Sequence, residues 1–126
     1  MNANGRFHRG EIVWGIDPFK DSAEAEPEPE RPFLVLSNET HPFAEQQFAG
    51  VALSTTPRDE AVAIDPNDWT AGGLPRQSYA YSWLLVTRDR VDVSSVYGRL
   101  RSATVDTVLD RLVGYLSARD SHGTDS

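Results

Sequence analysis

The sequence "ERPFLVLSN", from Glu30 to Asn38, joins an acidic, proline-rich segment to a run of apolar residues. The apolar run predicts a β-strand from Pro32 to Asn38. Pro32 suits the first position of that strand, where its missing N–H costs little hydrogen bonding. We therefore expect Arg31 to lie at the point where a loop meets a strand.

The segment before this strand has no hydrophobic periodicity. Residues Phe19 to Glu30 alternate acids with proline and alanine near their end, which predicts a long exposed loop of a kind that is usually functional or disordered. Before the loop, the alternation in "GEIVWGI", Gly10 to Ile16, predicts a strand with Ile12 and Trp14 on one face. Residues 1–8 are expected to form a flexible N-terminal arm.

The segments after Asn38 predict further short strands. "ETHPF" predicts a turn or a short helical excursion. "FAGVALST", from Phe48 to Thr55, predicts a strand that forms a hairpin with "AVAID", residues 61–65. Residues 66–78 are rich in turn formers, with Gly72 and Gly73 supplying backbone freedom. "YAYSWLLVT", residues 79–87, predicts a central strand. The stretch from Val96 to Leu100 fits either a short strand or a 3₁₀ turn.

The C-terminal segment predicts an amphipathic helix. Ser102 is a candidate N-cap, and Asp106 places a negative charge near the positive end of the helix dipole. The apolar residues recur at helical spacing and are expected to pack against the sheet: Val105, Val108, Leu109, Leu112, Val113 and Leu116. About five short strands followed by one helix predict a mainly β (α+β) fold, a small antiparallel barrel with a helix laid against it. Residues 119–126 are expected to form a disordered tail.

Composition limits the classes of protein that this chain can belong to. Its 126 residues suit one domain, and no apolar run reaches the length of a membrane span. The N-terminus lacks the apolar core of a signal peptide, so we expect a cytoplasmic protein. With no cysteine, disulfides, thiol nucleophiles and Cys-type zinc sites are excluded.

The charged residues are unusual in kind. Asp and Glu number 19, Lys and Arg number 12, and Lys20 is the one lysine among them. This acid excess favours the hypothesis of a halophilic source, because a hydrated acidic surface resists association in strong salt. At molar salt a polyanion is bound through close contacts rather than a broad basic field. Greater thermal stability in dilute than in molar KCl would contradict this hypothesis.

The chemical groups that remain are a guanidinium and several hydroxyls. His8, His41 and His122 lack metal-ligand spacing, and no phosphate-binding loop or nucleophile elbow occurs, so neither a metal nor a cofactor is expected. Arg31 begins one strand, and Ser54, Thr55 and Thr56 end another. Strand ends in a small barrel can lie side by side, where an arginine fork and a hydroxyl suit phosphodiester chemistry.

Three segments carry a resemblance to a known family. "RGEIVWGIDPF", "ERPFLVLSN" and "GVALSTT" resemble, in order and character, the opening strands of the MazF/PemK toxins. The Arg-Pro-strand-Asn segment is the most specific part, and the resemblance extends over roughly residues 9–117, so that residues 9–118 are expected to form one MazF/PemK-like domain.

The resemblance implies both a fold and an activity. It implies an SH3-like barrel, a homodimer, an antitoxin as partner, and a metal-independent endoribonuclease that cuts single-stranded RNA to 2′,3′-cyclic phosphate and 5′-OH ends. The catalytic residues carried over are Arg31 and Ser54, with Thr55 as an alternative to Ser54. The acids that precede Arg31 are expected to compete with RNA for it.

Other residues are candidates for contacts with RNA. Arg76, Gln77, Trp69 and Trp83 combine phosphate-binding and base-stacking groups, although core or dimer packing is the favoured role for the two tryptophans. An alternative function also stays open. It is a barrel of the same shape that binds nucleic acid or a protein partner without catalysis.

Overall fold

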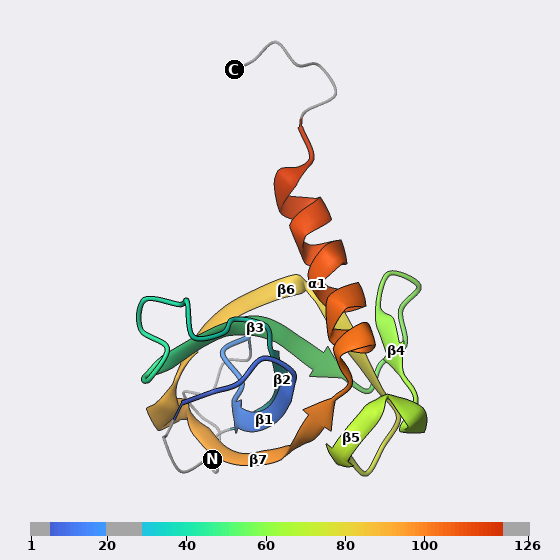
Figure 1. The fold of residues 1–126 in the computed structure, drawn as a ribbon. Coiled ribbons are helices and arrows are strands. Elements are labelled where there is room, and N and C mark those ends of the chain that lie inside the picture. The colour runs from blue at the N-terminus through green and yellow to red at the C-terminus, as the bar shows by residue number, and fades with distance from the viewer. Residues whose placement is uncertain (1–5, 20–28, 120–126) are drawn as a thin grey trace.

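Seven antiparallel strands form one curled sheet, and a single long helix rises from it (Figure 1). The computed structural model describes residues 6–19 and 29–119. The elements in chain order are β1 (Glu11–Ile16), β2 (Glu30–Val35), β3 (Gln47–Ser54), β4 (Val62–Ile64), a 3₁₀ turn η1 (Pro66–Asp68), β5 (Trp69–Gly72), β6 (Ser78–Asp89), a 3₁₀ turn η2 (Arg90–Asp92), β7 (Val93–Leu100) and α1 (Ser102–Ser117). The predicted antiparallel barrel with a C-terminal helix is confirmed.

The order of strands across the sheet is β4-β6-β3-β2-β1-β7-β5. The predicted hairpin between residues 48–55 and 61–65 is wrong, because β3 pairs with β6 and β4 pairs with the opposite edge of β6. The twelve residues of β6 explain this arrangement. Tyr79 pairs with Ser54 of β3 on one side and with Ala63 of β4 on the other. A long strand thus separates two segments that are close in sequence.

The bounds of β2 differ from the predicted ones. The strand begins at Glu30 and ends at Val35, so that Pro32 is its third residue rather than its first. Pro32 lies opposite Trp14 of β1, whereas pairing of β2 with β3 begins only at Phe33. Pro32 therefore sits where β2 has one neighbouring strand, and a missing N–H is tolerated there.

The stretch from Trp69 to Leu100 contains a strand that the sequence did not predict. Residues 69–72 form β5 along β7, and the ambiguous segment before Leu100 is strand, with its 3₁₀ turn earlier, at Arg90–Asp92. Gly72 adopts a φ of +66°, as its predicted backbone freedom requires. A Cβ at Gly72 would also lie 2.0 Å from the carbonyl oxygen of Tyr97, so only glycine fits between β5 and β7.

Two apolar clusters form the core, one on each side of the curled sheet. In the first cluster, strand residues such as Ile12, Leu34 and Leu53 pack with residues of α1. The second cluster lies inside the curve of the sheet and is built around Phe33 and Phe48. Alternation along β1 and β2 explains the division, because neighbouring residues of a strand face opposite sides.

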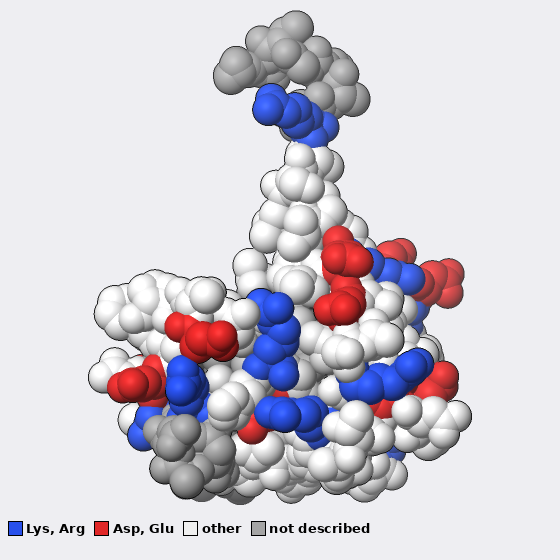
Figure 2. Space-filling model, viewed as in Figure 1, with Lys and Arg blue, Asp and Glu red and all other residues white. Residues whose placement is uncertain are grey.

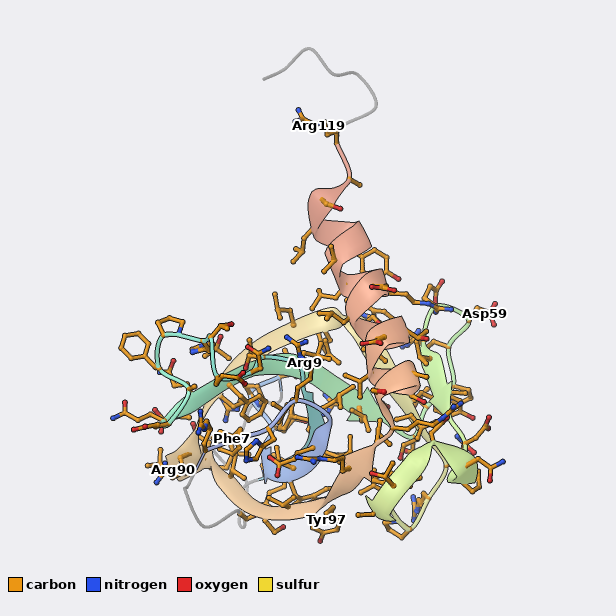
Figure 3. All side chains as sticks on the ribbon, in the orientation of Figure 1. Phe7, Arg9, Asp59, Arg90, Tyr97 and Arg119 are labelled. Carbon is orange, nitrogen blue, oxygen red and sulfur yellow. The ribbon has the colours of Figure 1, made fainter. Side chains whose placement is uncertain are left out.

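The described part of the N-terminal arm contributes to the second cluster. Phe7 is buried and packs edge-on against Phe48, with 4.9 Å between ring centroids (Figure 3). The domain boundary placed at residues 8 and 9 stays a prediction, but Phe7 belongs to the core. Residues 1–5, the loop residues 20–28 and residues 120–126 lie outside the described residues.

The helix α1 packs against the sheet along its first half. Val105, Val108 and Leu112 are buried, whereas Val113 and Leu116 are 50% and 67% exposed. Packing of these last two residues against the sheet was therefore a wrong prediction, since α1 extends past the barrel (Figure 1). The predicted N-cap was wrong as well, because Arg101 is the N-cap and Ser102 is the first helical residue. In the described part of the chain, no helix is both long and apolar enough to cross a membrane.

A buried carboxylate secures the start of α1. Asp68, at the end of η1, accepts hydrogen bonds from the Thr104 hydroxyl at 2.7 Å, the Arg101 Nε at 3.1 Å and the Asp65 N–H at 2.7 Å. Burial raises the pKa of Asp68, but these hydrogen bonds and the Arg101 charge outweigh it, so the pKa lies below its ordinary value. The ionised form of Asp68 therefore stabilises the fold.

We expect Asp68→Asn to lower the free energy of unfolding by about 2 kcal/mol, because a buried charged acceptor is lost. Because the folded pKa is the lower one, this stabilisation is present above about pH 4 and disappears as the pH falls through the folded pKa. Chemical unfolding at pH 7 and at pH 3 measures both effects, with Asp110→Asn, on the exposed face of α1, as the control. Equal unfolding free energies for Asp68→Asn and wild type at pH 7 would contradict the assignment.

Candidate active site

Arg31 lies in the first part of β2, which pairs with β1 alone. Two residues later, at Phe33, β2 also begins to pair with β3. Arg31 lies opposite Gly15 of β1, and its Nε donates a hydrogen bond to the Leu53 carbonyl oxygen at 3.3 Å. Leu53 directly precedes Ser54, the last residue of β3. This contact places the guanidinium beside the end of β3.

Two residues that follow β1 also contact the Arg31 guanidinium. Its Nη1 lies 3.7 Å from the Asp17 Oδ2, and its central carbon lies 5.6 Å from the centre of the Phe19 ring. The side chain of Asp17 is 3% exposed, and that of Arg31 is 19% exposed. Arg31 thus keeps a route to solvent while its carboxylate partner has none.

The hydroxyls at the end of β3 differ in their surroundings. Ser54 is half-buried, and its Oγ accepts a hydrogen bond from the Thr56 N–H at 3.1 Å. With an acceptor lone pair occupied in this way, the Ser54 hydroxyl proton is available for donation. Thr55 is exposed beside it. Both hydroxyls line one hollow, and Ser54 is the more fixed of the two.

This hollow has a volume of about 230 Å³ and lies between the ends of β2 and β3 and the loop after β5. Its lining is largely apolar, with a few polar groups. The lining residues are Trp14, Pro32, Ser54, Thr55, Leu74, Pro75, Arg76 and Ser78. A concave, mostly apolar surface with convergent polar groups is the usual form of a ligand site.

Trp14 is a part of the hollow that the sequence did not identify as a site residue. Trp14 was predicted to share a face of its strand with Ile12. Its side chain is half-buried, whereas that of Ile12 is buried. The Trp14 ring stacks on Tyr97 of β7 with 5.3 Å between ring centroids. Tyr97 projects outward from β7 (Figure 3). Two stacked rings of which one borders the hollow form a flat surface that suits a nucleobase.

The predicted RNA-contact residues are divided among three places. Arg76 is exposed and lines the hollow, whereas Gln77 is bound to the sheet, donating its amide to the carbonyl oxygens of Ile64 at 2.7 Å and Ser78 at 3.1 Å. Trp69 packs against the first apolar cluster and lines a second hollow, which Gln77 also lines and which shares Arg76 with the first. Trp83 stacks on Tyr81 and is absent from the lining of both hollows.

The negative net charge of the chain is unevenly distributed. Arg9, Arg99 and Arg101 line a third hollow at the start of α1, and Figure 2 shows arginines around the base of the helix. Arg101 is paired with Asp68, and the Arg9 Nε donates to the Leu36 carbonyl oxygen. Within residues 6–19 and 29–119, no group of three or more His, Cys, Asp or Glu side chains is placed to hold a metal ion.

Comparison with families of known sequence identifies one match. Residues 8–116 match the model of the PemK-like, MazF-like toxins of type II toxin–antitoxin systems. A search of curated proteins found no match.

Solved structures of similar shape cover nearly the whole chain. An endoribonuclease from a mycobacterial species, solved in complex with its cognate antitoxin, has 20% sequence identity and a TM-score of 0.66, over 95% of this chain and 99% of that one. MazF of Deinococcus radiodurans has 15% identity and a TM-score of 0.68, over 90% and 98%. The MazE–MazF complex of the same organism has 16% identity and a TM-score of 0.70, over 90% and 97%. At these identities the likeness establishes the fold.

Proposed function

This chain belongs to the family of PemK-like, MazF-like toxins of type II toxin–antitoxin systems, and from that membership we propose that it is an endoribonuclease that cleaves single-stranded RNA. One observation carries the proposal: the Arg31 Nε is hydrogen-bonded to the carbonyl oxygen of Leu53, the residue directly before Ser54, and Ser54 lines a solvent-accessible hollow. Several of the solved structures of the same fold are endoribonucleases by name.

The proposed reaction is a transesterification within the RNA. The 2′-oxygen of one nucleotide attacks the adjacent phosphorus, the bond from phosphorus to the 5′-oxygen breaks, and a 2′,3′-cyclic phosphate and a 5′-OH result. The proton lost from the 2′-OH is balanced by the proton that the departing 5′-oxygen takes up, so water suffices as the proton carrier. The reaction requires stabilisation of the negative charge on the pentacoordinate phosphorus.

Arg31 supplies most of that stabilisation. A guanidinium stays protonated at all physiological pH values and presents donors in a fork that matches two phosphate oxygens. Its partial burial strengthens this interaction, because water screens a charge less where the side chain is only 19% exposed. Arg31 is therefore proposed as the principal catalytic residue.

Ser54 supplies a directed hydrogen bond. Because its Oγ already accepts from the Thr56 N–H, its own proton is free to point toward a phosphate oxygen in the hollow. The apolar walls around it, Trp14 and Pro32 among them, reduce screening and offer a surface for an unpaired base. Arg76, which lines the hollow from the loop after β5, is proposed to contact a flanking phosphate.

Incubation with a mixed-sequence RNA in EDTA and molar KCl tests the proposal. The expected result is cleavage that persists in EDTA, since neither Arg31 nor Ser54 needs a metal ion to act. Intact RNA in the presence of folded protein would contradict nuclease activity and favour the alternative, a barrel that binds nucleic acid or a partner without catalysis.

Ser54→Ala is expected to lower kcat by about 10²-fold, the usual effect of removing one donor that stabilises a transition state. Ser54→Thr should retain most of the activity, because it keeps the hydroxyl. Thr55→Ala is the matched control, since it removes an exposed hydroxyl from the same hollow, and it should change kcat less than threefold. Single-turnover cleavage measures all three, and a larger loss for Thr55→Ala would transfer the proposed role to Thr55.

The proposed partners follow from the family as well. A toxin of this kind is paired with an antitoxin, and one of the similar endoribonucleases was solved with its cognate antitoxin. We also expect a homodimer acting in the cytoplasm. Sedimentation of the purified protein in molar KCl tests the dimer, and a monomer at micromolar concentration would contradict it.

A further inference from the structure

Asp17 is a buried carboxylate that lies beside the Arg31 guanidinium. It follows β1 directly, its side chain is 3% exposed, and its Oδ2 faces the Arg31 Nη1 at 3.7 Å. A carboxylate this deeply buried is normally paired, because taking an unpaired charge out of water is costly. The ionised partner that the structure gives to Asp17 is Arg31, the residue at the centre of the proposed site.

The chain around Asp17 fixes the direction of its carboxylate. The Asp17 N–H donates to the Pro29 carbonyl oxygen at 2.9 Å, which closes the base of the loop between β1 and β2. Its Oδ1 accepts the Phe19 N–H at 2.8 Å, forming a turn in which Pro18 lies between the two residues. With Oδ1 engaged in the turn, Oδ2 remains to face Arg31.

The described contacts of Arg31 engage its Nε, its Nη1 and one face of its guanidinium. Its Nε is bound to Leu53, its Nη1 faces Asp17, and Phe19 lies against the face of the group. Among residues 6–19 and 29–119, no hydrogen-bond or ion-pair partner is assigned to Nη2. Within the described part of the chain, three residues thus hold the guanidinium, and Nη2 is the nitrogen left to bind a ligand.

We propose that Asp17 is a positioning residue that, together with Phe19, holds the Arg31 guanidinium so that its Nη2 points toward the scissile phosphate. The inference rests on the proposed nuclease function and adds a residue to its machinery. Asp17 acts through Arg31 and not on RNA, because its buried carboxylate has no route to a substrate. Nothing in the Arg-Pro-strand pattern itself points to Asp17, which lies fourteen positions earlier in the chain than Arg31.

The charge of Asp17 favours the chemical step but opposes binding of the RNA. It orients Arg31, which favours the transition state, but it also offsets part of the positive charge that attracts the RNA phosphate. Asp17→Asn keeps an oxygen that can accept the Phe19 N–H and removes the negative charge. We expect kcat to fall by about 10- to 100-fold through loss of alignment, while KM stays unchanged or falls.

Asp92→Asn is the matched control. Asp92 also pairs with an arginine, Arg88, at 3.5 Å, but Arg88 is not the arginine proposed to act on RNA. This variant should change kcat less than threefold. Circular dichroism of both variants at equal protein concentration separates a fall in kcat from a general loss of folded protein.

Chemical rescue tests the contact directly. In Arg31→Ala, added guanidinium ion can enter the space between Asp17 and Phe19, and we expect it to restore cleavage at least tenfold. The double variant Arg31→Ala with Asp17→Asn should show no such rescue, whereas Arg31→Ala with Asp92→Asn should retain it. Equal rescue of all three proteins would overturn the proposed role of Asp17.

A measurement without RNA separates this inference from the nuclease proposal. The side-chain ¹⁵N resonances of Arg31 in the free protein should show restricted rotation that Asp17→Asn removes and Asp92→Asn leaves in place. Unchanged Arg31 resonances in Asp17→Asn would overturn the inference whatever the activity. Failure of the wild-type protein to cleave RNA would instead overturn the nuclease proposal, and that outcome is visible before any variant is made.

Discussion

Arg31→Ala should lower kcat/KM for RNA cleavage by about 10³-fold, the largest effect expected of any single side chain in this protein. The variant loses the charge that stabilises the pentacoordinate phosphorus. Arg31→Lys should recover little of the loss, because an ammonium group can reach neither Leu53 and Asp17 together nor two phosphate oxygens at once.

The control for this prediction removes an equal charge elsewhere. Arg119 lies beyond the end of α1, far from the barrel (Figure 3), so Arg119→Ala should change kcat/KM less than threefold. Initial rates on a fluorescently labelled single-stranded RNA measure all three variants, with circular dichroism to establish folding. If folded Arg31→Ala cleaves within threefold of wild type, Arg31 is not catalytic.

Gly50→Ala should have the largest effect on stability, at least about 3 kcal/mol, and can prevent folding altogether. Gly50 is in the middle of β3, opposite Val35 of β2. A Cβ there would lie 2.1 Å from the Leu34 carbonyl oxygen and 3.2 Å from the Phe48 ring. The first contact is with backbone, so β2 and β3 would have to separate.

Separation of β2 and β3 would also damage the proposed site, because the Arg31 contact with Leu53 spans these two strands. Guanidinium chloride unfolding compares Gly50→Ala with Gly73→Ala, where a Cβ would meet no atom within 4 Å. The control should stay within about 1 kcal/mol of wild type. A Gly50→Ala protein of wild-type stability would show that the two strands are spaced more widely than described.

The parts of the fold that the sequence predicted are those set by local patterns. Alternation between Glu11 and Ile16 identified β1, and helical spacing from Val105 to Leu112 identified the buried half of α1. At Val113 and Leu116 the same spacing continues although the sheet has ended. Periodicity reports that a residue is apolar, and it does not report how far the partner surface extends.

The pairing of strands could not be predicted in the same way. The turn after Ser54 suggested a hairpin with residues 61–65, but β6 is long enough to pair with β3 and β4 on opposite edges. β5 was missed because its four residues, Trp69 to Gly72, are too few to alternate clearly. Both errors concern contacts between distant segments, which no local pattern records.

In the candidate site as well, the sequence predicted which residues lie at strand ends but not the contacts between distant segments. The positions of Arg31 and Ser54 at strand ends predicted that they could be neighbours. Arg31 is hydrogen-bonded to Leu53, the residue before Ser54, and the joint catalytic role of Arg31 and Ser54 stays a prediction. Asp17 was not identified as a site residue, although the pairing of Gly15 with Arg31 brings it to the guanidinium. Gln77 looked like a ligand-binding amide, but its donors are used within the sheet.

Analysis of the ends of the cleaved RNA tests the central claim most directly, since that claim is that Arg31 and Ser54 stabilise attack by the 2′-OH on its own phosphate. Products of the wild-type protein, formed in EDTA, should carry a 5′-OH that polynucleotide kinase labels without prior phosphatase treatment, and an otherwise identical RNA with a single 2′-deoxy nucleotide at the cleavage position should stay intact there. Fragments with a 5′-phosphate, or cleavage at the 2′-deoxy position, would contradict the account.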